Sequence, residues 1–255
     1  MNILAIINIT NNSLGIKKNK NNIIFYIKKL IQYKITAIDI GAQATNPLNP
    51  RQLLDKEEKK RLNKNLLKKI IKICHKNNIL VSIDTYRIYI MKYIIKENID
   101  IINDIQGFNS NEKINLLLKS KKTGIVMHNI ATVASLSNFM STKDDVTTDI
   151  YHWCINKKQE LINSGIESDQ IILDIGIGAY GKNNTQSWNL LKSIDLIRKI
   201  NTKLLVGHSY KGFIREIGDK DNITIIVSIY LKEKNIDFIR VHNIEYHRKF
   251  IKYNY

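Results

Sequence analysis

Two side chains near the end of the sequence have the types and the spacing of an anion site. Arg240 and His242 are separated by one residue in a short apolar run, so on a strand their side chains point to the same side. A guanidinium beside an imidazole can hold an oxyanion or a phosphate through charge-assisted hydrogen bonds. A structural ion pair is the alternative, but an inward-facing arginine needs an anion. We therefore expect an anion site here.

Three further residues have the chemistry to recognise a flat heterocycle. Asp84, Asn103 and Asp174 each end a different apolar run. A carboxylate can accept paired N–H donors from such a ring, and an amide adds both a donor and an acceptor. General acid–base work and turn formation are the alternatives, and the residue types leave them open. The glycine-rich segment that follows Asp174, up to Lys182, could let a ligand approach the backbone closely.

These residues follow apolar, β-branched segments that we predict to be strands. Near-continuous apolar runs are typical of parallel strands covered on both faces. Between them, apolar residues recur at helical spacing, as in 23–31, 62–71 and 194–200. The longest helix is predicted from about Asp144 to Ser164, with Thr142 before its start. The predicted strands are Ile3–Asn8, Ala37–Gly41, Leu80–Asp84, Ile99–Asp104, Gly124–His128, Ile171–Gly176, Leu204–His208 and Phe238–His242.

The number of strand–helix units predicts the fold. Eight such units of about 35 residues make a single (β/α)₈ TIM barrel, an α/β fold. A doubly wound sheet is the rival, but it usually has fewer strands, and no GxGxxG follows the first strand. No linker divides residues 1–255, so we predict one domain. Barrel active sites lie at the C-terminal strand ends. Polar residues gather there and predict a ring around one mouth: Asn8, Asp39, Thr45, Asp84, Asn103, Asp104, His128, Asp174, His208, Lys211, Arg240 and His242.

Composition excludes several classes of protein. The chain is 44% hydrophobic and 25% charged, unlike a disordered protein. It has no run of about 20 apolar residues, and its N-terminus does not resemble a signal peptide. The net charge of +17 comes mostly from scattered lysines, without a nucleic-acid-binding motif, so we expect neither a nucleic-acid nor a membrane partner. Two separated cysteines, Cys74 and Cys154, predict buried thiols and a cytoplasmic protein.

Several segments together resemble one family, in its order and at its spacings. That family is dihydropteroate synthase, within the pterin-binding barrel group, and the resemblance covers nearly the whole chain. The hairpin that usually precedes the first strand is missing. The matching segments are Asn8-Ile-Thr10, Ile38-Asp-Ile-Gly41 with Thr45-Asn-Pro47, Ser82-Ile-Asp-Thr85, Ile102-Asn-Asp-Ile105, Met127-His128, Leu173-Asp174 with Gly181-Lys182, Val206-Gly-His-Ser-Tyr-Lys211 and Arg240-Val-His242.

The resemblance implies an enzyme of folate synthesis. It would join para-aminobenzoate to 6-hydroxymethyl-7,8-dihydropterin diphosphate, forming 7,8-dihydropteroate and releasing diphosphate. By position, Asn8 matches the family's Mg²⁺ ligand. Arg240 and His242 match the residues that hold the diphosphate, and Thr45 matches a hydroxyl group near it. The resemblance is also the only ground for expecting a homodimer.

The resemblance also implies a pterin pocket. Asp84, Asn103 and Asp174 match the groups on the hydrogen-bonding edge of the pterin, and Lys211 matches a lysine that contacts it. The chemistry needs stabilisation of the departing diphosphate and a well-placed neutral amine. The implied catalytic residues are Lys211, Arg240 and His242.

The sequence departs from the family pattern where para-aminobenzoate and the closing loops are expected. The first loop, 11–15, lacks an aspartate, while Asn46, Tyr210 and Gly212 replace an arginine, an arginine and a serine. Gln43 and His208 are also unusual for the family. A pterin-binding paralogue without turnover is therefore one alternative. A pterin-dependent methyltransferase domain is another, although Lys211 and Arg240 favour a diphosphate-bearing substrate. A nucleic-acid-binding barrel is the outsider.

Overall fold

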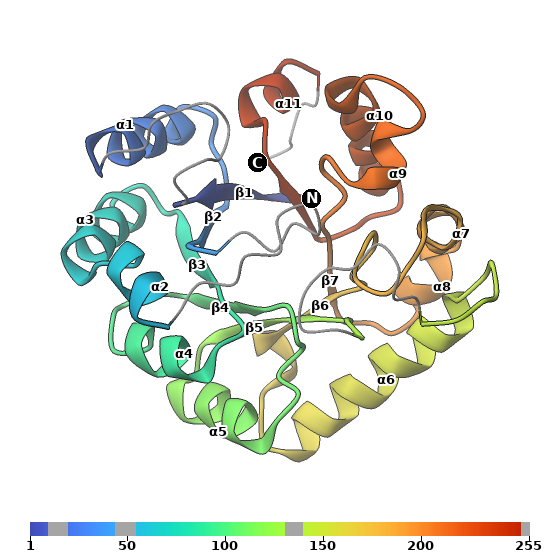
Figure 1. Cartoon of the computed structure of the whole chain (residues 1–255), viewed down its shortest axis with the longest axis horizontal. Coiled ribbons are helices and arrows are strands. Elements are labelled where there is room, and N and C mark those ends of the chain that lie inside the picture. The colour runs from blue at the N-terminus through green and yellow to red at the C-terminus, as the bar shows by residue number, and fades with distance from the viewer. Residues whose placement is uncertain (10–19, 44–54, 131–139, 251–255) are drawn as a thin grey trace.

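The computed structural model describes residues 1–9, 20–43, 55–130 and 140–250. Their strands form a closed barrel in the order β1 to β8, and every neighbouring pair is parallel. The barrel closes where β1 pairs with β8. Figure 1 shows the helices arranged in a ring outside the strands. The predicted (β/α)₈ barrel is confirmed.

The predicted strands are all present, with ends that differ by at most two residues. Four of them stop earlier than predicted: β5 and β8 end one residue earlier, and β6 and β7 end two residues earlier, at Asp174 and Val206. Beyond β6, Gly176 has a φ of +61°, a conformation that strands do not adopt. The strands are β1 Asn2–Asn8, β2 Ala37–Gly41, β3 Leu80–Asp84, β4 Ile101–Asp104, β5 Thr123–Met127, β6 Ile171–Asp174, β7 Lys203–Val206 and β8 Phe238–Val241.

The helices follow the predicted periodicity, with two shifted starts. The longest begins at Thr147 rather than near Asp144, because Asp145 Oδ1 accepts the Thr147 N–H in a turn before it. Asn63 caps α3, so Leu62 lies before that helix. The helices are α1 Lys20–Ile31, α2 Asp55–Arg61, α3 Lys64–His75, α4 Ile88–Ile94, α5 Asn111–Ser120, α6 Thr147–Asn163, α7 Asn184–Lys192, α8 Ile194–Arg198, α9 Gly212–Arg215, α10 Lys220–Glu233 and α11 Ile244–Phe250, with the 3₁₀ turn η1 Ser168–Gln170.

Side-chain alternation along the strands gives the barrel two apolar layers. The large outer core fills the space between strands and helices and includes both cysteines, Cys74 and Cys154, which are buried and free as predicted. A smaller inner cluster closes the lower part of the barrel: Leu4, Ala37, Ile101, Ile125, Ile172 and Leu205, with Phe238 packed against it. None of the helices in the described part of the chain has the length and apolarity to cross a bilayer.

Candidate active site at the barrel mouth

The strand register brings polar residues together above the inner apolar cluster. Asn8 pairs with Gly41, Gly41 pairs with Asp84, and Asp84 pairs with Asn103, across β1 to β4. Residues in register point to the same face of a sheet. Each also lies an even number of residues beyond an inward-facing residue of its own strand, and therefore faces inward too. Asn103, for example, lies two residues beyond Ile101 of the inner cluster. Three residues that the sequence analysis assigned to the site are therefore neighbours at the mouth.

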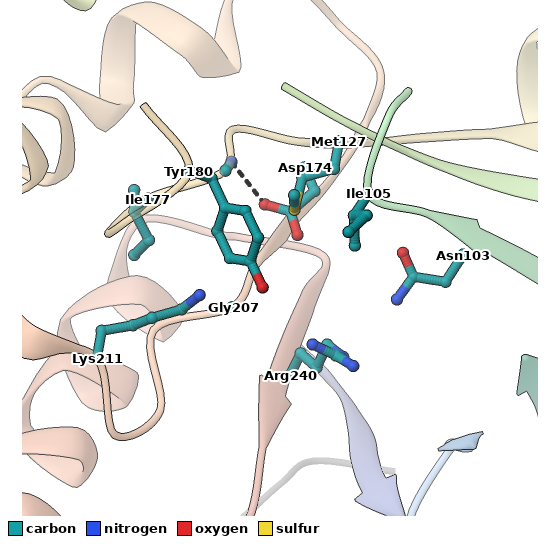
Figure 2. Close-up of a pocket in the computed structure, with 10 residues that line it drawn as sticks. Asn103, Ile105, Met127, Asp174, Ile177, Tyr180, Gly207, Lys211 and Arg240 are labelled. Carbon is teal, nitrogen blue, oxygen red and sulfur yellow. Dashed lines mark hydrogen bonds between the residues drawn. The ribbon is translucent and has the colours of Figure 1, made fainter. Parts of the chain in front are cut away.

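A pocket opens among these strand ends. It combines carboxylate, amide and cationic groups with an apolar wall, as ligand pockets usually do. The space left inside it is about 10 Å³, measured to the centre of a water molecule, which is room for about one water. The lining residues are Asn103, Ile105, Met127, Asp174, Gly176, Ile177, Tyr180, Gly207, Lys211 and Arg240 (Figure 2).

Arg240 does not face the pocket as an isolated cation. Its Nε lies 2.6 Å from Asp39 Oδ2, and its Nη2 lies 2.5 Å from Asp84 Oδ2. Burial alone would lower the pKa of Arg240, but the carboxylates of Asp39 and Asp84 outweigh burial and raise the pKa. The anion that we inferred for this arginine is thus supplied in part by the protein itself. Its predicted role in holding a diphosphate stays a prediction.

The carboxylate of Asp39 joins three residues of the barrel interior. Oδ2 accepts hydrogen bonds from Arg240 and from Asn103 Nδ2, the latter at 2.9 Å, and Oδ1 accepts one from Ser82 Oγ at 2.6 Å. Asp39 is completely buried. The sequence analysis placed Asp39 at a strand end but gave it no role, because the partners come from three other strands.

Two carboxylates and one lysine at the mouth have pKa values shifted toward neutrality. Burial raises the pKa of Asp84 to about 7, against the opposing effect of Arg240. Burial also raises the pKa of Asp174, although the Gly176 N–H and Lys211 favour its charged form. The pKa of Lys211 falls to about 8 by burial. Such shifts in one pocket are typical of functional sites.

Asp174 and Lys211 both line the pocket, and each contacts a residue of the glycine-rich loop. Asp174 Oδ1 accepts the Gly176 N–H at 2.8 Å, which leaves Oδ2 toward the pocket. Lys211 Nζ lies 4.3 Å from the centre of the Tyr180 ring. Figure 2 shows this ring reaching in among Asp174, Lys211 and Arg240. Tyr180 is the aromatic wall of the pocket. The sequence analysis missed it, although its place in a glycine-rich loop after a strand was a usable signal.

His242 lies beside this pocket as a neutral imidazole. Its Nδ1 is 3.0 Å from Ser209 Oγ, and its ring stacks on Tyr210 with centroids 4.8 Å apart and planes 7° apart. Burial lowers the pKa of His242 to about 3, and nearby cations such as Arg240 add to the effect. The Tyr210 hydroxyl donates to Asp221 Oδ1 at 2.6 Å. His242 can therefore donate a hydrogen bond to an anion, but it brings no charge at neutral pH.

A buried lysine supports the loop that carries Tyr180. Lys182 Nζ lies 2.9 Å from His128 Nδ1 and 2.9 Å from the Gly176 carbonyl oxygen. Lys182 is almost wholly buried, and burial lowers its pKa to about 7. A Cβ on Gly176 would lie 2.0 Å from the His128 carbonyl oxygen, so only glycine fits this close approach.

Three of the predicted mouth residues point away from the mouth, which corrects the expected ring. The Asp104 carboxylate binds Lys113 and the Gln106 and Phe108 N–H groups. His128 lies between Lys182 and the edge of Trp153, and His208 binds Ser228 Oγ at 2.8 Å on α10. Adjacent strand residues face opposite sides, so Asn103 faces the mouth and Asp104 cannot.

The remaining predicted positions are accounted for as follows. Thr45 and Asn46 lie outside the described residues, as does the departing first loop, 11–15. Gln43, unexplained by the sequence analysis, donates from Nε2 to the Tyr86 hydroxyl at 3.3 Å. The structure thus brings Asp84, Asn103, Asp174, Lys211 and Arg240 to one pocket and its rim, with His242 and Asn8 beside it.

The oxygen atoms around Gly41 suit a magnesium ion. A Cβ on Gly41 would lie 3.3 Å from Asn8 Oδ1 and 3.8 Å from Asp84 Oδ2, so both oxygen atoms lie near this glycine, and Asp84 Oδ2 is also bound by Arg240 Nη2. Magnesium prefers such hard oxygen ligands and completes its shell with waters and substrate phosphates. In the described part of the chain, no three His, Cys, Asp or Glu residues form a dedicated metal cluster. The donor set therefore fits an ion shared with a substrate.

Known proteins match this chain over most of its length. The family model for pterin binding enzymes matches residues 4–242. The chain is similar to a type-3 dihydropteroate synthase of Escherichia coli, with 28% identity over 95% of this chain and 94% of that one. It spans 56% of the longer folate synthesis bifunctional protein of Chlamydia caviae, with 26% identity over 95% of this chain.

A solved structure of a similar protein has the same fold. Dihydropteroate synthase from Anaplasma phagocytophilum, with bound 6-hydroxymethylpterin-monophosphate, superposes with a TM-score of 0.86 and 28% identity, over 96% of this chain and 94% of that one. Its barrel and the barrel described above share one topology. With the family model covering almost the entire sequence, this chain belongs to the pterin-binding enzyme family.

Proposed function

We propose that the protein catalyses the dihydropteroate synthase reaction of folate synthesis. In this transferase reaction, the amine of para-aminobenzoate attacks the methylene carbon of 6-hydroxymethyl-7,8-dihydropterin diphosphate, the carbon–oxygen bond breaks, and diphosphate leaves. The product is 7,8-dihydropteroate. The observation that carries the proposal is one pocket that holds Asn103, Asp174, Lys211 and Arg240 at the barrel mouth of a family member.

The pocket supplies complementary groups for the pterin edge. Asp174 offers Oδ2 as an acceptor for ring N–H groups, since its Oδ1 is engaged by Gly176. Asn103 offers its carbonyl oxygen, because one of its N–H groups is held by Asp39. Lys211 adds a cation beside the ring position. Apolar side chains of Ile105, Met127 and Ile177 would cover the faces of a flat heterocycle, which favours ring systems over flexible ligands.

The rim groups would stabilise the leaving diphosphate. The remaining donors of Arg240 can contact phosphate oxygens, and His242 can add a neutral hydrogen bond. Bound Mg²⁺, held by Asn8 with waters and phosphate oxygens, would neutralise part of the charge on the leaving group. The protein needs no covalent nucleophile, because the pterin ring can delocalise positive charge at the methylene carbon. Placing the two substrates and supporting the departing anion are then its main tasks.

A direct assay tests the proposal. Purified protein is incubated with the pterin diphosphate, para-aminobenzoate and Mg²⁺, and both diphosphate release and dihydropteroate formation are measured. We expect both products in equal amounts, and neither when one substrate is omitted. Asp174→Asn is the matched control, because it keeps the shape of the pocket but presents a donor where an acceptor is needed. No dihydropteroate with both substrates and Mg²⁺ present would refute the proposal.

A paralogue that binds the pterin without turnover is the second candidate. The loop departures Asn46, Tyr210 and Gly212 favour it, because they fall on the side expected for para-aminobenzoate. The same assay separates the two, since the paralogue would bind the pterin diphosphate and form no dihydropteroate. We further propose a cytoplasmic location, which fits two buried free thiols, and a homodimer, which light scattering of the purified protein would test.

A further inference from the structure

We propose that Asp39 is a positioning residue of the pterin site, which orients Arg240 and Asn103 without touching the substrate. This inference rests on the proposed function, because it takes the pocket as the place where the pterin binds. Asp39 lies two residues before Gly41, the last residue of β2, and so lies deeper in the barrel than the mouth. It is in register with Ser82 on β3 and Ile6 on β1. It therefore belongs to the layer of inward-facing side chains directly beneath the pocket residues.

Both oxygen atoms of the Asp39 carboxylate are bound by the protein. Its side chain is completely buried, and it accepts three hydrogen bonds from Ser82, Asn103 and Arg240. Asp84, by contrast, accepts only from Arg240 among the described residues and keeps 13% of its side chain exposed. A ligand can thus reach Asp84 and exchange its contacts, whereas Asp39 has no surface to offer. The two carboxylates that neutralise Arg240 have different functions.

The hydrogen bonds of Asp39 and Asp84 determine the orientation of the Arg240 guanidinium group. A guanidinium is planar and presents its donors in a rigid fork. Asp39 holds Nε and Asp84 holds Nη2, so two anchors define the plane of the group. Within the described part of the chain, Nη1 makes no hydrogen bond. The edge that carries Nη1 is therefore available for a ligand, in a direction set by the buried anchor.

The same carboxylate fixes the amide of Asn103. One N–H of Asn103 is bound to Asp39 Oδ2, so the amide cannot turn freely, and its oxygen has a fixed direction. Figure 2 shows Asn103 and Arg240 on the same side of the pocket. An oriented group loses less conformational entropy when a ligand binds than a freely rotating one. We infer that Asp39 raises pterin affinity by ordering both groups before the ligand arrives.

Two substitutions, one on β3 and one at the residue that follows it, test this with a matched control. Ser82→Ala removes the hydroxyl that holds Asp39 Oδ1, and Thr85→Val removes a buried hydroxyl that holds Glu58 Oε1 at 2.8 Å. Both changes delete one buried hydrogen bond to a carboxylate, but only the first touches the Asp39 cluster. Affinity for the pterin diphosphate, and for 6-hydroxymethylpterin without the diphosphate, is measured by calorimetry on the folded proteins.

We expect Ser82→Ala to weaken binding of both pterin compounds by about five- to tenfold, since a hydrogen bond to a charged group orients the cluster. Thr85→Val should leave both affinities unchanged while lowering the melting temperature to a similar extent. Asp39→Asn should have a larger effect, about 100-fold, if it folds despite losing half of a buried ion pair. Ser82→Ala keeps the test valid if Asp39→Asn does not fold.

A spectroscopic measurement follows the contact itself. The Arg240 Nε–H signal in ¹⁵N-labelled protein should be slow to exchange in the wild type, and faster in Ser82→Ala but not in Thr85→Val. Equal losses of melting temperature with unchanged pterin affinity in both variants would overturn the inference and leave Asp39 a purely structural residue. Wild-type protein that binds no pterin compound would instead refute the proposed function, whatever the Arg240 signal shows, and the inference with it.

Discussion

Lys182 Nζ lies 2.9 Å from His128 Nδ1, so a fully buried lysine connects the loop after β6 to the end of β5. Its second contact at 2.9 Å is the carbonyl oxygen of Gly176, within the loop that carries Tyr180 into the pocket. Among the described residues, no carboxylate is hydrogen-bonded to Lys182. Its charged form is therefore unfavourable in the folded protein.

The first prediction concerns the pH dependence of stability. The pKa of Lys182 falls from 10.5 to about 7 on folding, so between these values the unfolded chain binds more protons than the folded one. Stability should therefore rise with pH above about 7, by at most about 1.4 kcal/mol per pH unit from this group. Below pH 7 both states are protonated and the contribution is constant.

Urea denaturation of the wild type and of Lys182→Met at pH 7.0 and 9.0 measures this effect. The variant should gain less stability over that range than the wild type. Lys113→Met is the control, because Lys113 is also buried but forms an ion pair with Asp104 at 2.9 Å. It should lower stability at both pH values, by about 3–5 kcal/mol. Identical pH slopes for the wild type and Lys182→Met would contradict the prediction.

The second prediction concerns Arg240. Arg240→Ala should lower the free energy of unfolding by about 3–5 kcal/mol, because it leaves two buried carboxylates without their cation. In the folded fraction, affinity for the pterin diphosphate should fall by at least about tenfold more than affinity for free 6-hydroxymethylpterin, since only the first ligand contacts the guanidinium through phosphate oxygens. Calorimetry with both ligands provides the measurement. Equal losses for the two ligands would limit Arg240 to a structural role.

The third prediction concerns Asp174. Asn at this position can still accept the Gly176 N–H through its carbonyl oxygen, so the loop should keep its conformation and the melting temperature should change little. The second oxygen becomes an NH₂ group, which opposes the pterin N–H groups. We expect a loss of pterin affinity of about 1–3 kcal/mol. A large fall in melting temperature with intact affinity would instead assign Asp174 to the architecture of the barrel.

The fourth prediction concerns para-aminobenzoate. The residues that replace two arginines and a serine of the family pattern remove contacts for its carboxylate, of about 1–3 kcal/mol each. We expect a raised Michaelis constant for this substrate and ordinary binding of the pterin diphosphate. Gly212→Ser combined with Asn46→Arg should lower the constant in steady-state kinetics.

The structure allows a serine in place of Gly212. Among the described residues, apart from its chain neighbours, a Cβ on Gly212 meets only Asn184 Oδ1, at 3.4 Å. Gly212→Ala, which adds the Cβ without the hydroxyl, is the matched control for the serine. A Michaelis constant that stays the same in the double variant would show that other residues hold the carboxylate, with Lys17 and Lys18 of the first loop the next to test.

The sequence by itself determined the barrel and the approximate ends of its strands. Apolar runs and helical periodicity are local patterns, and the strand–helix repeat leaves few folds to choose from. The strand ends then located Asp84, Asn103 and Asp174 at one edge. The resemblance to a known family added the reaction and the roles of residues such as Arg240, which no local pattern contains.

Only the tertiary structure decided which polar residues face the mouth and which are already paired. Asn103 and Asp104 are adjacent, yet Asn103 faces the pocket and Asp104 binds Lys113, because consecutive side chains of a strand point to opposite faces of the sheet. The partners of Asp39 include Arg240, 201 residues away in the sequence. Such a contact depends on closure of the barrel between β1 and β8. The spacing of residues along the sequence does not show that these two distant strands lie side by side.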